Sequence, residues 1–568
     1  MKRILTLVAS ALIVSACSGI PSSAPIKYGT EINSNTSDQF IQVIGRPPVA
    51  GMDQAQIVNG FLAALADSRA EYLVAKQYLL PETASIWRPN AGITIYESAV
   101  LDFTVAGDVA TTRISKFGVV DPSGYLEIAP NGTQQTINFT LAKNEQGEWR
   151  IKQLADGILL TANDVDRSFN GYPVYFLSPD RKNLVADTVL FPQSVTGSAT
   201  ALIRALLDGQ SNSLAFATVS AFPTGTKLSY DSVPVDQGVA TVDLTEQVLS
   251  ADQATRAQMC AQIVWTLSSL PNVSSVEIKV SGQPFAPSGI SEIQRTSDWE
   301  SFNPKQFDGE ELVHFVRGGQ VFALGLDGTE TLVTQTNPNS KVEIGQAKGA
   351  IDGGSTAAVS SDGKQVLLST GRGGELKVIA TGDSVTKPAW DQLGSVFFAD
   401  YGVGIFEYNS KGQIRAVGFE TTNYGLVTQV KRIAIAKDGV RIAIVISNGS
   451  TDYLLGGAIA KSPESTRIVG LHLLERNITS VKDLVWHSPT SLAVLGSDQS
   501  GGNLIFDIDL STGANTSVSA PLNAQSIASS LAKQIYVGTT SGAKSTIAKQ
   551  TGTSWSDFVS GSSPYLSK

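Results

Sequence analysis

The sequence has very few of the residues that build metal sites and histidine-based catalytic triads. Its 568 residues include two cysteines and three histidines, His314, His472 and His487. A zinc site takes three or four nitrogen, sulfur or carboxylate ligands, and a triad needs a nucleophile and an acid around its histidine. The sequence has no HExxH, paired CxxC, GxSxG or GxxxxGK[ST] pattern. Each histidine lies in or beside a predicted strand, so we expect structural imidazoles, no metal site and no cofactor.

Paired carboxylates are the one kind of catalytic site that this scarcity leaves open. Two acidic groups that act on a glycosidic bond can come from distant parts of a chain, so their spacing in the sequence says little. No specific pair stands out among the 51 acidic residues. We therefore expect no catalytic residues, and a protein that is not an enzyme.

Charge is also sparse and evenly spread. Charged residues make up 16% of the chain, and the net charge is −9 with no basic cluster. Binding to phosphate backbones or to anionic lipid surfaces depends on clustered lysine and arginine. The composition therefore excludes nucleic acid as a partner, and it excludes membrane attachment through a basic patch.

The one long apolar run lies at the N-terminus. Residues 4–14 are almost all apolar and follow Lys2 and Arg3, and the run is too short to span a bilayer. The small residues Ser15 and Ala16 come next, which is the order found in a secretion signal. We expect residues 1–16 to be a signal peptide that is removed.

Cys17 follows these small residues directly. The segment Val14-Ser15-Ala16-Cys17 resembles a bacterial lipobox. The resemblance implies that the Cys17 thiol takes a diacylglycerol, that its amine is N-acylated and that it begins the mature chain. Two or more acyl chains hold a protein stably at a bilayer. We expect a lipid-anchored protein on the extracytoplasmic face of the cell membrane; the alternative is an ordinary secretory signal with a chance cysteine.

The chain after the lipobox is predicted to be a spacer followed by folded domains. Residues 17–39 are rich in Ser, Pro, Asn and Thr, which is typical of a flexible linker. The other cysteine, Cys260, has no intramolecular disulfide partner once Cys17 is lipidated. It lies in the helical pattern of residues 256–267, where we expect a small buried hydrophobic residue.

Residues 40–165 are predicted to form an α+β domain. Asp53 can cap a helix together with Gln56, and apolar residues recur at helical spacing through Leu65. A second helix is predicted over 72–79, ended by Pro81. Short alternating runs follow at residues 93–95, 100–105, 111–117, 136–141 and 149–151. Two helices and a curved antiparallel sheet resemble the NTF2-like class, whose members include many binding modules.

Residues 170–295 show a more specific pattern. A strand is predicted over 174–177, a helix over 199–207 ended by Gly209, a strand over 239–244, a helix over 251–268 and a strand over 276–280. The wording PTGT, GVATVDL and QIVWTL, in this order, resembles the GerMN domain of spore germination proteins. The resemblance implies an α+β binding or assembly domain. We expect Asp243 and Thr245 to mark a strand end and a helix start.

Residues 305–568 are predicted to form an all-β propeller. They are rich in Gly, Ser, Thr and Val, with Asp-Gly turns at Asp327, Asp362 and Asp438. Repeated units place strand anchors at Val321, Val366, Val396, Ile442, Leu492 and Ile535. The intervals are 45, 30, 46, 50 and 43 residues, of which four match the length of a four-stranded blade. We expect about six blades, with the short interval unexplained.

Two further features of this region bear on its function. The run 507–513 contains two aspartates but lacks the later carboxylates of an EF-hand, so we expect a strand that enters a polar turn. The units Ala389-Trp390-Asp391 and Val485-Trp486-His487 fit the same repeat frame. The replacement of the acidic residue by His487 indicates that these blades have diverged.

The lipobox, the spacer SGIPSSAP, the α+β domain, the GerMN-like domain and the propeller together resemble the actinobacterial LpqB lipoproteins over nearly the whole chain. The fold class expected is therefore multidomain: two α+β domains, then an all-β propeller. The resemblance implies an accessory protein that contacts the extracytoplasmic part of an MtrB-like sensor kinase and modulates MtrA/MtrB-type two-component signalling, cell-envelope homeostasis and division.

The residues leave a second class of function open. A non-catalytic protein of this kind is alternatively a cell-wall binding or envelope assembly factor that holds glycan or peptide. Tyr401, Tyr424 and Tyr453 lie in predicted loops and suit stacking on sugars if they gather on one face of the propeller. The sequence does not place the surface that contacts either partner.

Overall fold

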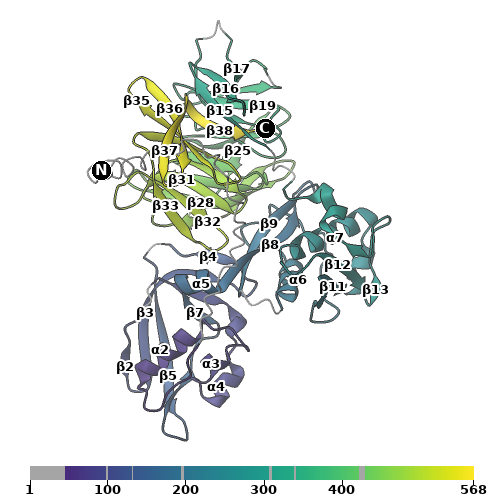
Figure 1. Cartoon of the computed structure of the whole chain (residues 1–568), viewed down its shortest axis with the longest axis vertical. Helices are drawn as coiled ribbons and strands as arrows, with labels where there is room; N and C mark the ends of the chain where they lie inside the picture. Colours follow the sequence, from purple (N-terminus) through teal and green to yellow (C-terminus); the bar gives the residue numbers. More distant parts are fainter. Residues whose placement is uncertain are drawn as a thin grey trace, which may run out of the picture. The chain divides into compact units, whose positions relative to one another are not determined.

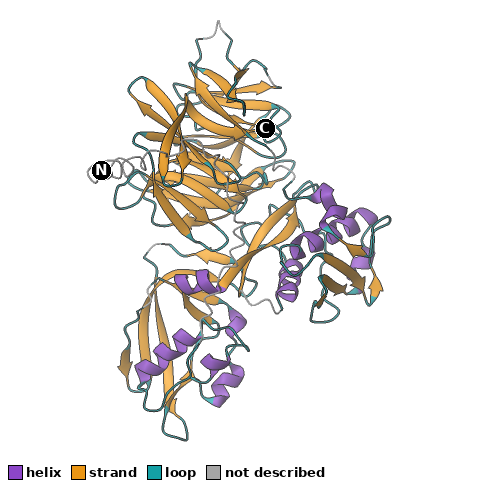
Figure 2. Ribbon diagram, viewed as in Figure 1, coloured by secondary structure: helices purple, strands orange, loops and turns teal. Residues whose placement is uncertain are grey.

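The computed structural model describes residues 45–97, 100–130, 132–192, 197–305, 310–337, 341–371, 373–420 and 429–568 (Figure 1). Val14, Ser15, Ala16 and Cys17 lie outside the described residues, as do the spacer and Tyr424. The described chain is a multidomain protein in which helices occur in two α+β domains and strands make up the long C-terminal part (Figure 2).

The N-terminal domain begins with the predicted capped helix, which is confirmed as α2 (Gln54–Ala64). Asp53 accepts a hydrogen bond from the Gln56 backbone N–H, and the Gln56 side chain accepts one from the Asp53 backbone N–H, which forms a capping box. The apolar face of α2 is buried, and the Phe61 ring meets Trp87 edge-on, with 5.6 Å between ring centroids. The helix is therefore fixed by its cap and by its core face.

The prediction for the segment after α2 is wrong in one respect. The helix expected over 72–79 is shorter, α3 (Leu73–Lys76), and Pro81 starts a further helix, α4 (Pro81–Ile86). Proline suits the first turn of a helix, because its φ is already helical and the backbone N–H it lacks has no acceptor there. Pro81 thus separates two short helices by beginning the second.

The sheet of this domain has the order β6-β5-β3-β1-β7, with β2 and β4 paired to β3. Its strands are β1 (Ile93–Tyr96), β2 (Thr104–Ala106), β3 (Val109–Val120), β4 (Leu126–Ile128), β5 (Gln134–Lys143), β6 (Trp149–Gln153) and β7 (Ile158–Thr161). The run expected over 100–105 is a strand only at its end, where β2 pairs with three residues of β3. The 3₁₀ turn η1 (Pro89–Ala91) precedes β1, and α5 (Ala162–Ser168) follows β7.

The middle domain is built around a long helix, α7 (Gln253–Leu267), which Asp252 caps. Its other elements are β8 (Phe169–Leu177), β9 (Leu184–Pro192), α6 (Ser198–Asp208), β10 (Val235–Asp236), β11 (Val239–Leu244), η2 (Glu246–Ser250), β12 (Ser275–Val280), β13 (Gln283–Pro284), β14 (Ile293–Gln294) and η3 (Thr296–Phe302). The strands β11 and β12 run parallel and are connected through α7. The predicted helices and strands of this domain are confirmed.

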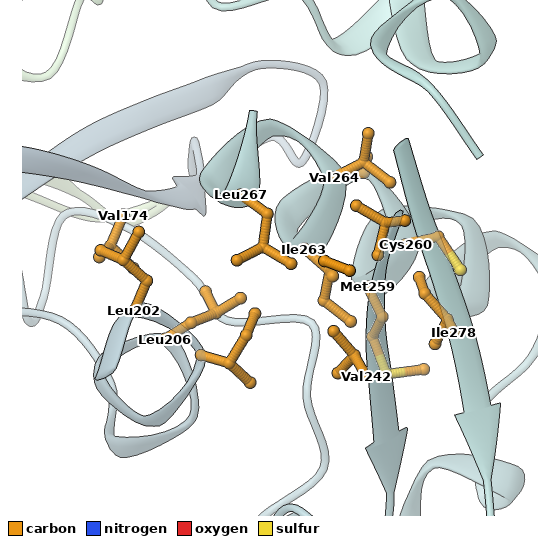
Figure 3. Packing of buried hydrophobic residues seen from close by; sticks show 14 of the residues in the cluster. Val174, Leu202, Leu206, Val242, Met259, Cys260, Ile263, Val264, Leu267 and Ile278 are labelled. Atoms are coloured by element: carbon orange, nitrogen blue, oxygen red, sulfur yellow. The ribbon is translucent and has the colours of Figure 1, made fainter. Parts of the chain in front are cut away.

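Buried side chains of α7 pack on two sides in this domain. Figure 3 shows Leu267 and Ile263 towards Leu206 of α6, and Met259 towards Val242 and Ile278 of the paired strands. Cys260 belongs to the same cluster and is fully buried, as predicted. A fully buried apolar side chain contributes about 1.5–3 kcal/mol relative to an exposed one, so this cluster is the main source of stability of the domain.

Short antiparallel strands build the C-terminal part. They are β15 (Leu312–Arg317), β16 (Gln320–Leu324), β17 (Glu330–Thr334), β18 (Ile344–Gly349), β19 (Ser355–Ser360), β20 (Gln365–Thr370), β21 (Lys377–Thr381), β22 (Ala389–Trp390), β23 (Val396–Asp400), β24 (Gly404–Tyr408), β25 (Ile414–Gly418), β26 (Val430–Ile435), β27 (Arg441–Ser447), β28 (Asp452–Lys461), β29 (Thr466–Glu475), β30 (Ser480–Ser488), β31 (Ser491–Ser497), β32 (Leu504–Asp509), β33 (Asn515–Ser519), β34 (Ala524–Ser529), β35 (Ile535–Ser541), β36 (Lys544–Thr551), β37 (Ser554–Ser560) and β38 (Ser562–Ser567).

These strands form four-stranded meanders. Four sheets contain β15–β17 with β38, β18–β21, β30–β33 and β34–β37. The fifth sheet has eight strands, because the outer strands β25 and β29 of two consecutive meanders pair in parallel at Val417 and Thr466. The last strand, β38, pairs with β15 at the beginning of the domain (Figure 1). The predicted count of about six blades stays a prediction, since two meanders share one continuous sheet.

The repeat anchors fall on two different strands of the meanders. Val366 lies in β20, the third strand of its meander, whereas Val396 lies in β23, the second strand of the next. The interval of 30 residues between them is therefore no short repeat. It arises because the anchor moves from one strand position to another.

Candidate functional site

The first strands of the meanders surround a central channel. Strand β18 lies next to β22, β22 next to β26, β26 next to β30, β30 next to β34 and β34 next to β38, and β38 lies against β18. The ring is therefore closed by the last strand of the chain. Closure of this kind removes free sheet edges and leaves a channel whose wall is made from segments far apart in the sequence.

A cavity of about 80 Å³ lies in this channel. Its wall is largely apolar, with short side chains such as Ala350, Ala389 and Ala436 beside the rings of Trp390 and Trp486. A water molecule takes up about 30 Å³, so the space holds about two or three waters or one small group.

The two tryptophans occupy equivalent positions in the wall. The Trp390 indole N–H donates to the Lys348 carbonyl oxygen at 3.0 Å, and the Trp486 indole N–H donates to the Ala434 carbonyl oxygen at 3.0 Å. In each case the acceptor belongs to the first strand of the preceding meander. The repeat frame predicted for the two Trp units is confirmed by this shared hydrogen bond, which links neighbouring meanders at the channel.

Charged side chains gather in this mostly apolar space. The Lys387 ammonium lies 3.3 Å from the Asp483 carboxylate, and the Lys437 ammonium lies 2.8 Å from the Glu311 carboxylate. Both pairs are largely shielded from solvent. Asp483 also accepts a hydrogen bond from the Ile527 backbone N–H at 3.0 Å, so its carboxylate is held on two sides.

Lys348 is one of four lysines that line the cavity, and its environment differs from that of Lys387 and Lys437. It is half-buried, lines the cavity, and its ammonium makes no hydrogen bond or ion pair with any residue that the structure describes. Loss of hydration, followed by repulsion from Lys387, lowers the pKa of Lys348 to about 8. Glu311 and Asp483 act in the opposite direction but pair with other lysines. Among the described residues, the Lys348 ammonium is therefore a cation of the channel without a hydrogen-bond or ion-pair partner.

Sequence reasoning missed these charged residues. One signal was present: Lys387 and Asp483 each stand three residues before a tryptophan of the repeat frame. Nothing comparable marks Lys348, Lys437 or Glu311, which enter the channel from different meanders. Their proximity follows from closure of the ring and not from their spacing in the sequence.

The three histidines lie in strands of the propeller, as expected. His314 is in β15 and stacks on Tyr565 with 4.8 Å between ring centroids. His472 is in β29, and its Nδ1 lies 2.8 Å from the Gly470 carbonyl oxygen. Burial lowers the pKa of His472. His487 is in β30 and belongs to a polar cluster.

That cluster contains a serine, a histidine and an aspartate. His487 Nδ1 is hydrogen-bonded to the Ser529 hydroxyl, and His487 Nε2 lies 3.5 Å from Asp507. The Asp507 carboxylate is closer to Lys533, at 2.7 Å. Burial lowers the pKa of His487 to about 4, so the imidazole is neutral at pH 7. In a catalytic triad the carboxylate accepts a hydrogen bond from the imidazole N–H. Here the Asp507 carboxylate binds Lys533, which favours a structural role for this cluster.

In the middle domain, the residues singled out from the sequence have structural positions. Asp243 ends β11 and accepts a hydrogen bond from the Gly282 backbone N–H at 2.9 Å. Thr245 precedes the 3₁₀ helix η2, and its hydroxyl accepts a hydrogen bond from the Lys227 backbone N–H at 3.0 Å. Gln262 of α7 is fully buried, donates to the Tyr175 carbonyl oxygen at 2.7 Å and accepts from the Ala221 N–H at 2.8 Å. This residue of the QIVWTL segment thus connects α7 to β8 and to the segment between α6 and β10.

The tyrosines considered for sugar stacking differ in exposure. Tyr401 is 40% exposed in the β23–β24 turn and donates to the Gln429 side chain at 2.7 Å. Tyr453, in β28, packs against a hydrophobic cluster. The run 507–513 is a strand end and a polar turn, as predicted, in which Asp509 accepts from the Ser511 backbone N–H. The described residues contain no cluster of potential metal ligands. None of their helices has the length and apolar character to span a membrane.

Three protein-family models match this chain. The model described as "Lipoprotein LpqB, N-terminal domain" matches residues 47–166, "Sporulation and spore germination" matches 173–286, and "Lipoprotein LpqB beta-propeller domain" matches 319–566. Together the two LpqB models cover more than half of the chain.

Relatives from actinobacteria match over most of their length. A protein named Lipoprotein LpqB from Thermobifida fusca (strain YX) is 26% identical, and the match covers 90% of each chain. Lipoprotein LpqB from Cutibacterium acnes is also 26% identical, over 87% of this chain and 86% of the relative.

Solved structures resemble parts of the chain. The first GerMN domain of the sporulation protein GerM from Bacillus subtilis is 19% identical, with a TM-score of 0.20, over 23% of this chain and 99% of that domain. A chain of a nidogen/laminin complex is 13% identical, with a TM-score of 0.36, over 46% of this chain and 99% of that chain.

Proposed function

Because this chain belongs to the LpqB lipoprotein family, we propose that it is a lipid-anchored accessory protein of the extracytoplasmic membrane face. In this proposal it is non-catalytic and modulates an MtrA/MtrB-type two-component system through contact with the extracytoplasmic domain of the MtrB-like sensor kinase. Cell-envelope homeostasis and division respond to that signalling. The support is the family match over most of the chain and the predicted lipidation at Cys17.

The membrane anchor favours such a contact physically. A lipid at Cys17 confines the protein to a thin layer next to the bilayer, where a membrane kinase also presents its outer domain. Confinement raises the effective concentration of each partner near the other. When short flexible linkers join two partners, this concentration is in the millimolar range. A modest intrinsic affinity is then sufficient for occupancy.

The observation that favours the middle domain as the contact surface is its exposed aromatic residues. Phe216 is 79% exposed and Tyr230 is 70% exposed, which makes them the two most exposed aromatic residues of the described chain. Aromatic side chains are enriched among the residues that contribute most to protein–protein binding. We therefore assign Phe216 and Tyr230 to the kinase-binding surface.

A binding titration tests this proposal. The full chain in mild detergent is titrated with the purified extracytoplasmic domain of the MtrB-like kinase, and with isolated cell wall as a parallel ligand. Saturable binding to the kinase domain supports signalling. Binding to cell wall alone overturns it and favours the alternative of a non-catalytic cell-wall binding or envelope assembly factor.

Two variants locate the surface. Phe216→Ala and Tyr230→Ala are each expected to weaken kinase binding by about 5- to 30-fold, the effect of losing 1–2 kcal/mol at an important contact. Leu522→Ala is the matched control, since Leu522 is 88% exposed on the propeller. Equal binding by all three variants would show that the contact lies elsewhere.

The anchor is tested separately. Cys17→Ser is expected to leave the precursor unlipidated and to shift it from the detergent phase to the aqueous phase in detergent partitioning. Retention of the variant in the detergent phase rejects lipid attachment at Cys17. This outcome does not depend on the kinase, so the two parts of the proposal fail independently.

A further inference from the structure

The propeller channel contains a cavity and charged residues that the proposed signalling contact does not use. The carboxylates of Glu311 and Asp483 are each paired with a lysine of the channel, Lys437 and Lys387. The Lys348 ammonium is left without a partner among the described residues while it lines the same cavity. The arrangement is thus complete except for one negative group.

Retaining such a cation has an energetic cost. A charge removed from water without a counter-charge is destabilising, and proteins usually pair it or neutralise it. The pKa of Lys348, lowered to about 8, still leaves the side chain mostly protonated at pH 7. A titratable group whose pKa is shifted by burial and by a charged neighbour, and which lines a cavity, is a candidate functional group.

From this geometry we propose that the channel binds a small oxyanion, a carboxylate or phosphate group, with Lys348 as the ion-pairing residue. The cavity of about 80 Å³ accepts one such group. Its Ala, Ile and Trp walls lower the local dielectric constant, which strengthens an ion pair relative to the same pair at the surface. Four lysines line the cavity, Lys348, Lys387, Lys437 and Lys568, and they disfavour cations.

The hydrogen-bonding groups around the cavity limit what else takes part. The Trp390 and Trp486 indole N–H groups already donate to backbone oxygens, so they are not available to the ligand. Ser529 lines the cavity but is hydrogen-bonded to His487. The buried Tyr565 hydroxyl also lines the cavity and has no hydrogen-bond partner among the described residues, so it is a further donor for the ligand. Lys348 supplies the charge, and specificity is for charge and size.

The oxyanion has two sources, a free ion or the end of a larger molecule that enters the channel. The full chain is titrated with sodium acetate, with inorganic phosphate, and with N-acetyl-alanyl-alanine in its free-acid and amidated forms. Trp390 and Trp486 line the cavity, so tryptophan fluorescence reports occupancy, and calorimetry confirms it. Binding of acetate or phosphate indicates a free ion, and binding of the acid peptide but not its amide indicates a chain end.

The decisive variant removes the charge of Lys348, and its control removes the charge of a lysine elsewhere. Lys348→Met is expected to weaken binding at least tenfold. Lys411→Met, at an exposed lysine of a surface turn, is expected to leave it unchanged. Thermal unfolding of each variant checks that the propeller remains folded.

A second readout does not depend on loss of the side chain. Raising the pH from 7 to 9 deprotonates Lys348, so acetate binding to the unmodified chain is expected to weaken about tenfold. Lys348→Arg keeps the charge at both pH values and is expected to bind without this pH dependence. The proposal is overturned if Lys348→Met binds as tightly as the unmodified chain, or if no oxyanion saturates the protein below about 10 mM.

Discussion

Lys387 and Asp483 occupy the same position of the repeat in two different meanders, three residues before Trp390 and Trp486, and their charged groups lie 3.3 Å apart. Between their strands in the ring stands β26. Divergence of one repeat position to opposite charges has therefore produced an ion pair that ties together non-adjacent meanders. Because Asp483 also accepts from the Ile527 N–H, the pair contacts the first strand of a third meander.

This relationship predicts a large effect of Asp483→Asn on stability. The substitution leaves the Lys387 ammonium without its partner in a largely buried site. Breaking a buried pair in this way costs about 3–5 kcal/mol in the free energy of unfolding. Urea denaturation of the full chain measures it.

The double variant Lys387→Met/Asp483→Asn separates loss of the pair from the cost of a lone buried charge. We expect it to recover part of the loss, because no unpaired ammonium remains. Asp557→Asn, at an exposed aspartate of β37, is the control. A loss no larger in Asp483→Asn than in this control contradicts the role assigned to the ion pair.

Local signals in the sequence predicted much of the fold. The Asp53–Gln56 capping box, the stop at Gly209 and the burial of Cys260 each depend on neighbouring residues, and each is confirmed. The prediction for Pro81 was wrong because proline occurs both after the end of a helix and in the first turn of a new one. Choosing between these needs the residues that pack on either side.

The channel was not predictable in the same way. Its charged groups come from β18, β30 and segments next to β15, β22 and β26, which meet only when the ring closes. The Asp-Gly turns do not mark one fixed strand position of the repeat either. Asp327, Asp362 and Asp438 follow the third, second and first strands of their meanders. Turn chemistry locates hairpins but does not number the strands within a blade.

The N-terminal domain is predicted to lose stability at low pH through Asp67. This buried carboxylate accepts hydrogen bonds from the Arg69 guanidinium at 2.7 and 2.6 Å and from the Gly45 N–H at 3.0 Å. The bond from Arg69 is the main cause that lowers the pKa of Asp67 below its ordinary value. Its contribution to stability is therefore complete above the unfolded pKa of about 3.9 and is lost as pH falls through the folded pKa.

Asp67→Asn tests this sign. At pH 7 the substitution is expected to cost about 1–3 kcal/mol, since charge-assisted hydrogen bonds are lost in a buried site. The difference from the unmodified chain should shrink as the pH is lowered from about 5 to about 2. Asp102→Asn, at an exposed residue of the same domain, serves for comparison. A difference that stays constant with pH excludes ionised Asp67 as its cause.

Cys260 is predicted to be chemically silent in the folded protein. Burial raises the pKa of its thiol to about 12, and the thiolate is the reactive form. In a Cys17→Ser background, where Cys260 is the remaining thiol, Ellman's reagent should react only after urea unfolds the chain. The Cys17→Ser/Cys260→Ala variant gives the background. Rapid reaction under native conditions contradicts the packing of α7.

Lys461 connects two meanders through buried charges and gives the last prediction. Its ammonium is paired with Asp391, lies 2.6 Å from Glu407 and donates to the Ser395 hydroxyl at 3.0 Å. Glu407 also accepts from the Thr466 hydroxyl at 2.5 Å, at the point where β25 and β29 pair in parallel. The network therefore bridges the two meanders next to the place where their outer strands pair.

Lys461→Met should therefore destabilise the propeller more than removal of a surface lysine does. It leaves the Asp391 and Glu407 carboxylates buried without a cation, at a cost of about 3–5 kcal/mol. Lys411→Met is the matched control and is expected to change the free energy of unfolding by less than about 0.5 kcal/mol. Equilibrium denaturation in urea compares the two. If both variants unfold at the same urea concentration, the Lys461 network does not join the meanders energetically, and backbone pairing of β25 with β29 alone must hold the sheet together.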